Sequence, residues 1–214
     1  MSIRHHLSDQ LLMAYSGGDL PEAFNLVVAT HVSLCDECRS RLGAFDAVGG
    51  AVLTDTDSVE MSEDSLAACL DRIDMLPQAT TRQPLKRAGC FPAPLADYIG
   101  GGPDAVKWRP LGMGVKQAML RTGRDASARL LYIPAGQAVP DHGHRGLELT
   151  LVLQGAFRDD SDRFGPGDIE IADEAVEHTP VAETGPACIC LAATDAPLRF
   201  NALIPRLAQP FLRI

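Results

Sequence analysis

The stretch from Gly136 to Gly155 constrains the fold of this chain more than any other part of it. It carries His142, His144 and Glu148, and Glu148 lies inside the apolar run Leu147–Leu153. Successive side chains of an extended strand point to opposite faces, so Glu148 faces away from the leucines beside it. Two imidazoles and one carboxylate at this spacing suit a divalent transition metal. The stretch therefore predicts a metal site at the start of a strand that is covered on both faces.

A further histidine, His178, follows a second stretch that begins at Gly167. Together with the spacing Gly-x5-His-x-His-x3-Glu-x6-Gly of the first stretch, this arrangement resembles the two motifs of the cupin family. The resemblance implies a double-stranded β-helix, or jelly roll, with a metal ion held by His142, His144, Glu148 and His178. Zn²⁺ or another divalent transition metal suits that ligand set. The chain departs from the second motif where the usual Pro, Gly and Asn are replaced by Asp173, Ala175 and Ala182.

Short apolar runs broken by Gly and Pro begin at about Ala105 and continue toward the end of the chain. Runs of this length with turn signals between them predict a β-sandwich or barrel. The expected strands are Val106–Leu111, Val115–Leu120, Ala128–Ile133, Leu147–Leu153, Asp168–Ala172, Thr179–Ala182, Cys188–Ala193 and Leu198–Ile204.

Residues 7–76 have the periodicity of helices instead. Ser8 can cap a first helix, and Pro21 suits the first turn of a second. Asp36 opens a third helix, and a fourth begins near Ser62. Four short helices make a small core, and a domain below ~70–80 residues usually needs additional stabilisation, for example by a metal ion or a disulfide.

The segment from Pro77 to Pro94 shows neither period and is rich in proline. Segments of this kind commonly separate domains. We therefore expect an α+β multidomain chain: a four-helix N-terminal domain over residues 1–76, a linker over 77–98 and a β domain over 99–214.

A second donor set, His31, Cys35 and Cys38, lies where the second and third predicted helices meet. The two cysteines are about one helical turn apart, so both sulfurs can face one point. Thiolates with imidazole in a tetrahedral set favour Zn²⁺. His5 and His6 both offer a fourth ligand, and chemistry alone does not choose between them. Such an ion would staple the small helical core, because structural zinc supplies ~10–16 kcal/mol of apparent folding energy in small domains.

An upstream histidine followed by His-x3-Cys-x2-Cys in a short acidic helical domain resembles the zinc-binding anti-sigma domain. That match assigns the ligands to His6, His31, Cys35 and Cys38. With the cupin-like half behind it, the whole chain resembles the ChrR-type anti-sigma factors. The resemblance implies a regulator and not an enzyme. Its N-terminal domain would sequester a group IV (ECF-type) sigma factor, and its cupin domain would carry the oxidative, singlet oxygen-type signal that ends the inhibition.

The net charge of −9 belongs to the N-terminal part, because residues 1–80 hold 13 acidic and 4 basic side chains and the other 15 of each sign cancel. An acidic domain favours a basic partner such as a sigma factor and argues against direct binding of nucleic acid. No apolar run approaches the ~18 residues of a membrane span, and the apolar segment of a signal peptide is missing. We therefore expect a cytoplasmic protein with reduced cysteines.

Cys188 and Cys190 share one face of a predicted strand. A redox pair near the cupin metal is one interpretation, and free cysteines in the core are the other. A second functional hypothesis is a cupin-type metal-dependent dioxygenase or isomerase with a regulatory N-terminal domain. Four protein ligands leave fewer open positions than a facial triad does, and no further acid–base constellation stands out, so the regulator is the preferred prediction.

Overall fold

The helices precede the β-strands in this protein, which a computed structural model describes over residues 2–76 and 86–200. The helices are α1 (Asp9–Gly17), α2 (Glu22–Val32), α3 (Asp36–Thr54), α4 (Ser65–Asp74), α5 (Ala93–Ile99) and the short 3-10 helix η1 (Pro103–Ala105). In these two described ranges, no helix combines the length and the apolar character that a bilayer span requires.

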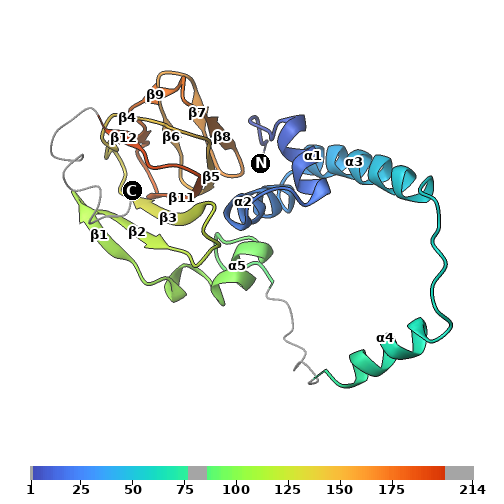
Figure 1. Cartoon of the computed structure of the whole chain (residues 1–214). Coiled ribbons are helices and arrows are strands. Elements are labelled where there is room, and N and C mark those ends of the chain that lie inside the picture. Colours follow the sequence, from blue (N-terminus) through green and yellow to red (C-terminus); the bar gives the residue numbers. More distant parts are fainter. Residues whose placement is uncertain (1, 77–85, 201–214) are drawn as a thin grey trace.

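The strands form one six-stranded sheet and two three-stranded sheets in the described chain, and every pairing is antiparallel (Figure 1). The large sheet has the order β1 (Arg109–Gly112), β2 (Val115–Met119), β3 (Ser127–Ile133), β11 (Cys188–Thr194), β5 (Glu148–Gln154) and β8 (Ile169–Ala172). The small sheets are β10 (Val181–Ala182), β6 (Phe157–Arg158) and β7 (Arg163–Phe164), and β12 (Arg199–Phe200), β4 (His142–Gly143) and β9 (Glu177–His178). Four N-terminal helices followed by this β-sandwich confirm the predicted fold class.

Local sequence sets the helix ends close to the first donor set. Ser8 caps α1 by accepting a hydrogen bond from the backbone nitrogen of Leu11 at 3.3 Å. Cys35 caps α3, and its sulfur accepts a hydrogen bond from the backbone nitrogen of Cys38 at 3.4 Å. Because an N-cap side chain folds back over the first turn, this bond holds the two sulfurs side by side at the start of α3.

Helix α2 joins the helical part of the molecule to the β part. It packs against β5, β11 and α5 and is buried over most of its length. Val27 and Val28 lie in the same hydrophobic cluster as Leu149, Leu151 and Leu191 of the large sheet. Burying a side chain of this size contributes ~1.5–3 kcal/mol. The two parts therefore stabilise each other through one continuous core.

Helices α3 and α4 extend away from that core. Cys38 is the one buried residue of α3, and α4 has none. An extended segment joins them, so that α4 lies apart from the sheets in Figure 1. The fourth helix begins at Ser65, a few residues after the start near Ser62 that the sequence predicts.

Helix α5 was not predicted, since it lies in the segment that the sequence indicates as a linker. Pro92 caps it and Pro94 occupies its first turn, where the fixed φ of proline suits a helix. Its buried Leu95 and Ala96 supply the tertiary contacts that so short a helix needs.

Four strands were also missed, namely β4, β6, β7 and β9, because two residues are too few to show alternation. The predicted strand Leu198–Ile204 contains β12, and its residues 201–204 lie outside the described chain.

Candidate metal centres and partner surface

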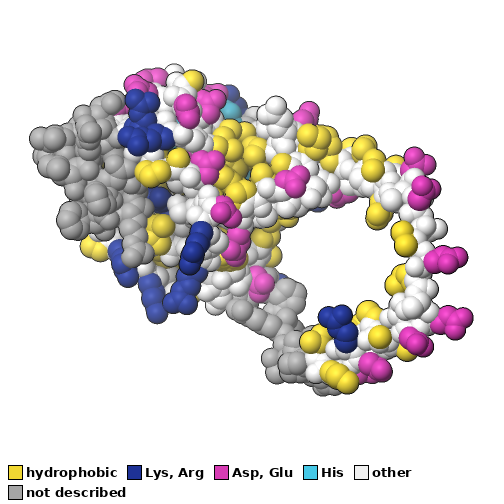
Figure 2. Space-filling model, in the orientation of Figure 1, with side chains coloured by type: hydrophobic (Ala, Val, Ile, Leu, Met, Phe, Trp, Pro, Cys, Tyr) yellow, Lys and Arg dark blue, Asp and Glu magenta, His cyan; other side chains and the backbone are white. Residues whose placement is uncertain are grey.

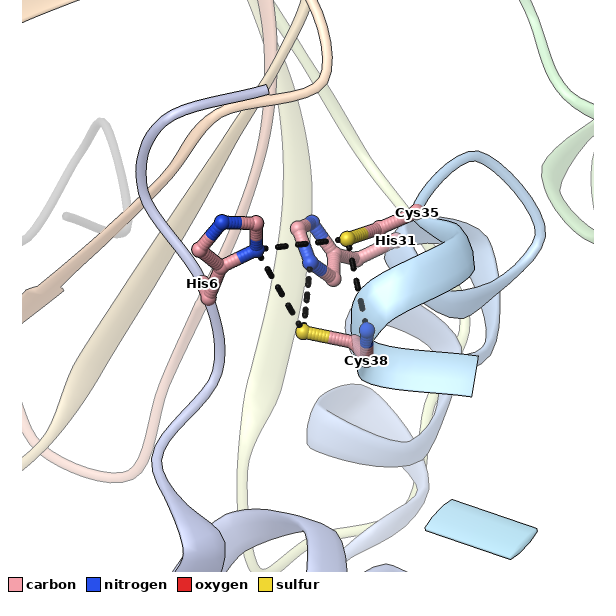
Figure 3. Close-up of side chains that lie close together, drawn as sticks. All are labelled: His6, His31, Cys35 and Cys38. Carbon is pink, nitrogen blue, oxygen red and sulfur yellow. Dashed lines mark hydrogen bonds between the residues drawn. The ribbon is translucent and has the colours of Figure 1, made fainter. Parts of the chain in front are cut away.

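Four donors converge at the junction of the N-terminal segment, α2 and α3 (Figure 3). His6 Nδ1 lies 3.3 Å from Cys35 Sγ and 3.8 Å from Cys38 Sγ, and His31 Nε2 lies 3.2 Å from Cys38 Sγ. All four donor atoms lie within 4.8 Å of one another. The ligand edges of a tetrahedral zinc site with mixed nitrogen and sulfur are roughly 3.5 Å, given Zn–S and Zn–N bonds of about 2.3 and 2.0 Å. The cluster therefore has the dimensions of a four-ligand metal site.

The structure separates the two adjacent histidines of the N-terminal segment. His6 faces the sulfurs, whereas His5 turns toward the β part, with its Nε2 atom 3.1 Å from Asp162 Oδ2. Neighbouring residues of an extended chain point in opposite directions. One of the two can therefore join the donor cluster while the other contacts the sheet.

The protonation properties of the cluster favour the metal-binding form of His31 but not that of Cys38. Burial lowers the pKa of His31 to about 4, so its imidazole is neutral at neutral pH, the form that binds a metal. Burial also raises the pKa of the Cys38 thiol to about 11, with the nearby Cys35 adding to the effect. A metal ion would have to displace a proton from Cys38, and metal binding at thiols generally releases protons in this way.

A second cluster lies inside the β-sandwich and brings together His142 of β4, His178 of β9 and His144 from the loop after β4. Strands β4 and β9 pair His142 directly with His178. The three imidazoles are buried, and each offers a ring nitrogen within 4.8 Å of the others. Residues 36 positions apart thus meet because two very short strands are neighbours.

Hydrogen bonds orient these three rings so that their Nε2 atoms face inward. Nδ1 of His142 lies 2.8 Å from the Pro140 carbonyl, and Nδ1 of His144 lies 3.1 Å from the Val176 carbonyl. A carbonyl accepts, so each Nδ1 carries the proton and each Nε2 presents a lone pair. His142 Nε2 and His178 Nε2 are 3.2 Å apart, and His144 Nε2 is buried with no hydrogen-bond partner. Of these three atoms, His144 Nε2 is the one without a partner, and a bound cation would supply it.

Glu148, the fourth predicted ligand, lies at the edge of this cluster. Its Oε2 atom is 3.9 Å from His144 Nε2, and its Oε1 atom accepts a hydrogen bond from the Thr150 hydroxyl at 3.1 Å. Its carboxylate lies outside the compact group formed by the three histidines.

Sequence reasoning missed two carboxylates that contact His178. Asp159 Oδ2 and Glu170 Oε1 lie 2.9 and 3.0 Å from His178 Nδ1. Burial opposes the effect, but the hydrogen bonds and charges of Glu170 and Asp159 raise the pKa of His178 to about 9. An acidic residue inside the apolar strand Asp168–Ala172 was the available signal for Glu170. Asp159 gave no such signal, because it lies in a turn.

A largely apolar cavity of about 320 Å³ opens beside the histidines. Arg129, Glu170 and Cys190 contribute polar atoms to its lining. The sulfurs of Cys188 and Cys190 are 3.5 Å apart, and both residues are buried with free thiols. The hydrogen bond between them and their burial raise the pKa of Cys190 well above its usual range. The cavity thus connects one thiol of the pair to the histidine cluster.

Exposed apolar side chains occur on the outer part of α3, on the segment after it, on α4 and on the two residues that follow α4, which together we call the α3–α4 face (Figure 2). Its members are Val48, Val52, Leu53, Val59, Met61, Leu66, Leu70, Ile73, Met75 and Leu76. Leu66, Leu70 and Ile73 recur at helical spacing, and 52–70% of each is exposed. Figure 2 shows acidic side chains interspersed with apolar ones over this part of the molecule. Large apolar side chains exposed in such number are typical of a surface that binds another protein.

Comparisons with known proteins cover both parts of the chain. The family described as the ChrR cupin-like domain matches residues 99–196. The anti-sigma-E factor ChrR of Cereibacter sphaeroides is 65% identical over 215 residues, and the match covers 100% of both chains. The crystal structure of Rhodobacter sphaeroides SigE in complex with the anti-sigma ChrR includes a chain with 63% identity and a TM-score of 0.80, which covers 91% of this chain and 100% of that chain.

Proposed function

The chain belongs to the ChrR family of anti-sigma factors, and from that premise we propose that it sequesters a group IV (ECF-type) sigma factor in the cytoplasm. The α3–α4 face is the observation that carries the proposal. It exposes large apolar side chains that a chain without a partner would bury. The related chain of the solved complex is bound to SigE, which makes a sigma factor the occupant to expect.

Charge supports the same partner. The 55–74 segment of the α3–α4 face carries Asp55, Asp57, Glu60, Glu63, Asp64, Asp71 and Asp74 against Arg72. Complementary charge raises the association rate and selects against acidic partners. A sigma factor binds DNA through basic surfaces, so an acidic apolar face can compete for them. The same charge disfavours direct contact with nucleic acid.

We assign Zn²⁺ to His6, His31, Cys35 and Cys38. Two thiolates and two imidazoles in a tetrahedral set favour zinc over harder cations. The ion would tie the N-terminal segment to α2 and α3 and so fix the base from which the α3–α4 face extends. We accordingly place the inhibitory domain at residues 1–76, the linker at 77–98 and the signalling domain at 99–214.

We assign Zn²⁺ or another divalent transition metal to His142, His144 and His178, with Glu148 as the fourth ligand. The unpartnered Nε2 atom of His144 and the convergence of the three buried imidazoles support a cation at this point. In the proposal this domain receives the oxidative signal, of the singlet oxygen type. Cys188 and Cys190 are the candidate redox pair, because Cys190 lines the cavity beside the histidines.

Run-off transcription with the cognate sigma factor tests the proposal. The wild-type chain should inhibit transcription, and oxidant should restore it. His142→Ala should keep inhibition but lose the response to oxidant, because it removes a residue that receives the signal and leaves the four N-terminal donors in place. Cys38→Ala should lose inhibition itself. Failure of the wild-type chain to inhibit the cognate sigma factor would refute the anti-sigma function, and constitutive release by His142→Ala would refute the division of labour.

The enzyme hypothesis has one observation in its favour, the apolar cavity beside the histidine cluster. A dioxygenase or isomerase would turn over a small apolar substrate there with a redox-active metal. The same preparations therefore need a metal analysis. Iron in the cupin cluster together with turnover and without sigma inhibition would favour the enzyme, whereas inhibition that depends on Cys38 favours the regulator.

A further inference from the structure

The N-terminal segment, residues 2–6, is bound to the β part of the molecule by its backbone. The backbone nitrogens of Arg4 and His5 donate to Asp168 Oδ1 at 2.6 and 3.1 Å. The backbone nitrogen of Ile169 donates to the carbonyl of His5 at 3.4 Å. Asp168 is almost fully buried, and its other oxygen accepts from the backbone nitrogen of Gly165 at 2.8 Å. The segment is therefore held by the turn that precedes β8.

The side chain of His5 makes a second attachment, to residues 159–162, which we call the acidic turn. His5 Nε2 lies 3.1 Å from Asp162 Oδ2, and its ring lies on Phe164 with 4.4 Å between centroids. The next residue, His6, belongs to the N-terminal donor cluster. The acidic turn therefore contacts His5, the residue directly before a member of that cluster.

The other end of the acidic turn contacts the cupin cluster. Asp159 Oδ2 lies 2.9 Å from His178 Nδ1, and the Asp159 side chain is 1% exposed. Asp159 Oδ1 accepts from the backbone nitrogens of Ser161 and Asp162 at 2.8 and 3.1 Å. One carboxylate therefore fixes both the ring of His178 and the shape of the turn.

Strand β8 makes the same connection by a parallel route. Glu170 Oε1 lies 3.0 Å from His178 Nδ1, and Asp168, two residues earlier, holds the N-terminal segment. The two donor clusters are thus joined by two short routes that both start at His178, one through the exposed acidic turn and one through the buried residues Glu170 and Asp168.

We infer that the acidic turn and β8 transmit the state of the cupin cluster to the N-terminal segment, and through His5 and His6 to the donor cluster that supports the α3–α4 face. The inference rests on the proposed function, since it names how the signal would cross the molecule. Asp159 and Glu170 act as positioning residues for His178. His5 is the residue that couples the two parts.

The expected response follows from the contacts. When the cupin cluster is disturbed, His178 loses its fixed orientation and Asp159 loses a partner. The acidic turn then samples more conformations, and Asp162 releases His5. A network of this kind can carry a signal only if perturbing one end changes the equilibrium at the other. If the contacts only attached the N-terminal segment and carried no signal, a perturbation of the cupin cluster would leave the conformational equilibrium of that segment unchanged.

Amide hydrogen exchange of the full-length chain, without a sigma factor, measures that change directly. In His142→Ala, and separately in His144→Ala, exchange of residues 2–7 should be faster by about two- to fivefold, the range supported by loss of one exposed pair. The Nδ1 atoms of the two replaced side chains face the carbonyls of Pro140 and Val176, which lie outside the acidic turn. Unchanged exchange in β11 serves as the check that the sheet is folded.

The decisive comparison uses two replacements in the acidic turn. Asp162→Asn weakens the contact with His5, whereas Asp160→Asn removes the same charge from an exposed neighbour. The effect of His142→Ala on residues 2–7 should be smaller in the Asp162→Asn background, where only the β8 route remains, and should persist in full in the Asp160→Asn background. His5→Phe keeps a ring against Phe164 and should behave like Asp162→Asn.

The outcomes separate this inference from the proposed function. A full effect of His142→Ala in the Asp162→Asn background, or no effect in the wild-type background, would overturn the relay even if the chain inhibits its sigma factor. Conversely, a chain that shows the coupling but does not inhibit would leave the relay in place and refute the anti-sigma function.

Discussion

At the scale of single residues, the cysteine and histidine positions determine what the N-terminal part can bind. Cys35 and Cys38 are oriented by a helix cap, and His31 ends the preceding helix. All three are within a short stretch, so their convergence is a local property. Replacing one donor leaves the other three with an incomplete set of ligands for a metal ion. Single replacements in this cluster should therefore change the metal content of the chain.

Cys38→Ser should remove about one zinc ion per chain, because three remaining ligands bind a structural ion weakly. Metal analysis of the purified full-length chain measures the loss. Cys69→Ser is the matched control, since Cys69 is exposed and outside the donor cluster. Equal zinc content in the two variants would contradict the assignment of Cys38 as a ligand.

Gly155 closes the stretch that most constrained the fold, and its conformation explains why glycine is needed there. Its φ is +69°, and an added Cβ would lie 2.7 Å from the carbonyl oxygen of Ala187. Gly155→Ala should therefore destabilise the chain by more than ~1 kcal/mol, measured by urea unfolding. Gly50→Ala, in an open helical position, should instead stabilise by about 0.5–1 kcal/mol. If the two replacements changed the free energy of unfolding by similar amounts, the backbone around Gly155 would have moved to make room for the added Cβ.

At the scale of elements, α2 and α4 illustrate two uses of an apolar helix. Helix α2 is buried along most of its length, because sheet and α5 cover it. Helix α4 has a comparable apolar stripe that is exposed. An apolar stripe on a helix predicts that the helix packs against another element. Only the tertiary structure shows whether that element belongs to the same chain.

Replacing Leu70 and Ile73 of α4 with alanine should weaken sigma binding by more than ~1 kcal/mol, since large apolar side chains at the centre of interfaces carry most of the affinity. Calorimetric titration measures the change. The folded chain should keep its stability, because both side chains are more than half exposed. Met113→Ala, also highly exposed but on the β1–β2 turn, is the control. Unchanged affinity of the double variant would remove α4 from the interface.

At the scale of the whole molecule, the helical and β parts share one core. Leu151 is fully buried between the large sheet and the helices. This arrangement lets the β part influence the helical part without a flexible hinge between them. It also means that the two parts should unfold together.

Leu151→Ala should destabilise the chain by about 2–5 kcal/mol, the usual cost of emptying a leucine-sized site in a core. Helical circular dichroism and fluorescence of Trp108 should report the same shifted unfolding midpoint, as expected for cooperative unfolding. Ile171→Ala, at a partly exposed position of the same sheet, should cost much less. Separate midpoints for the two signals would show that the parts unfold independently.

The sequence by itself determined the features that depend on close spacing. These are the helix caps, the strand alternation around Glu148, and the donor sets that begin at His31 and His142. It also predicted a helical part followed by a β-sandwich or barrel, because the period changes along the chain, and the resemblance to the cupin motifs implied the jelly roll. Such signals are readable since each arises from residues a few positions apart.

The tertiary structure decided what depends on residues far apart in the chain. It brought His6 to the sulfurs and paired His5 with Asp162, 157 residues away. It placed Asp159 and Glu170 on His178, and it laid α2 on the sheet while leaving α4 exposed. No local pattern encodes these choices, because each is set by the packing of one continuous core and by which polar groups must find partners within it.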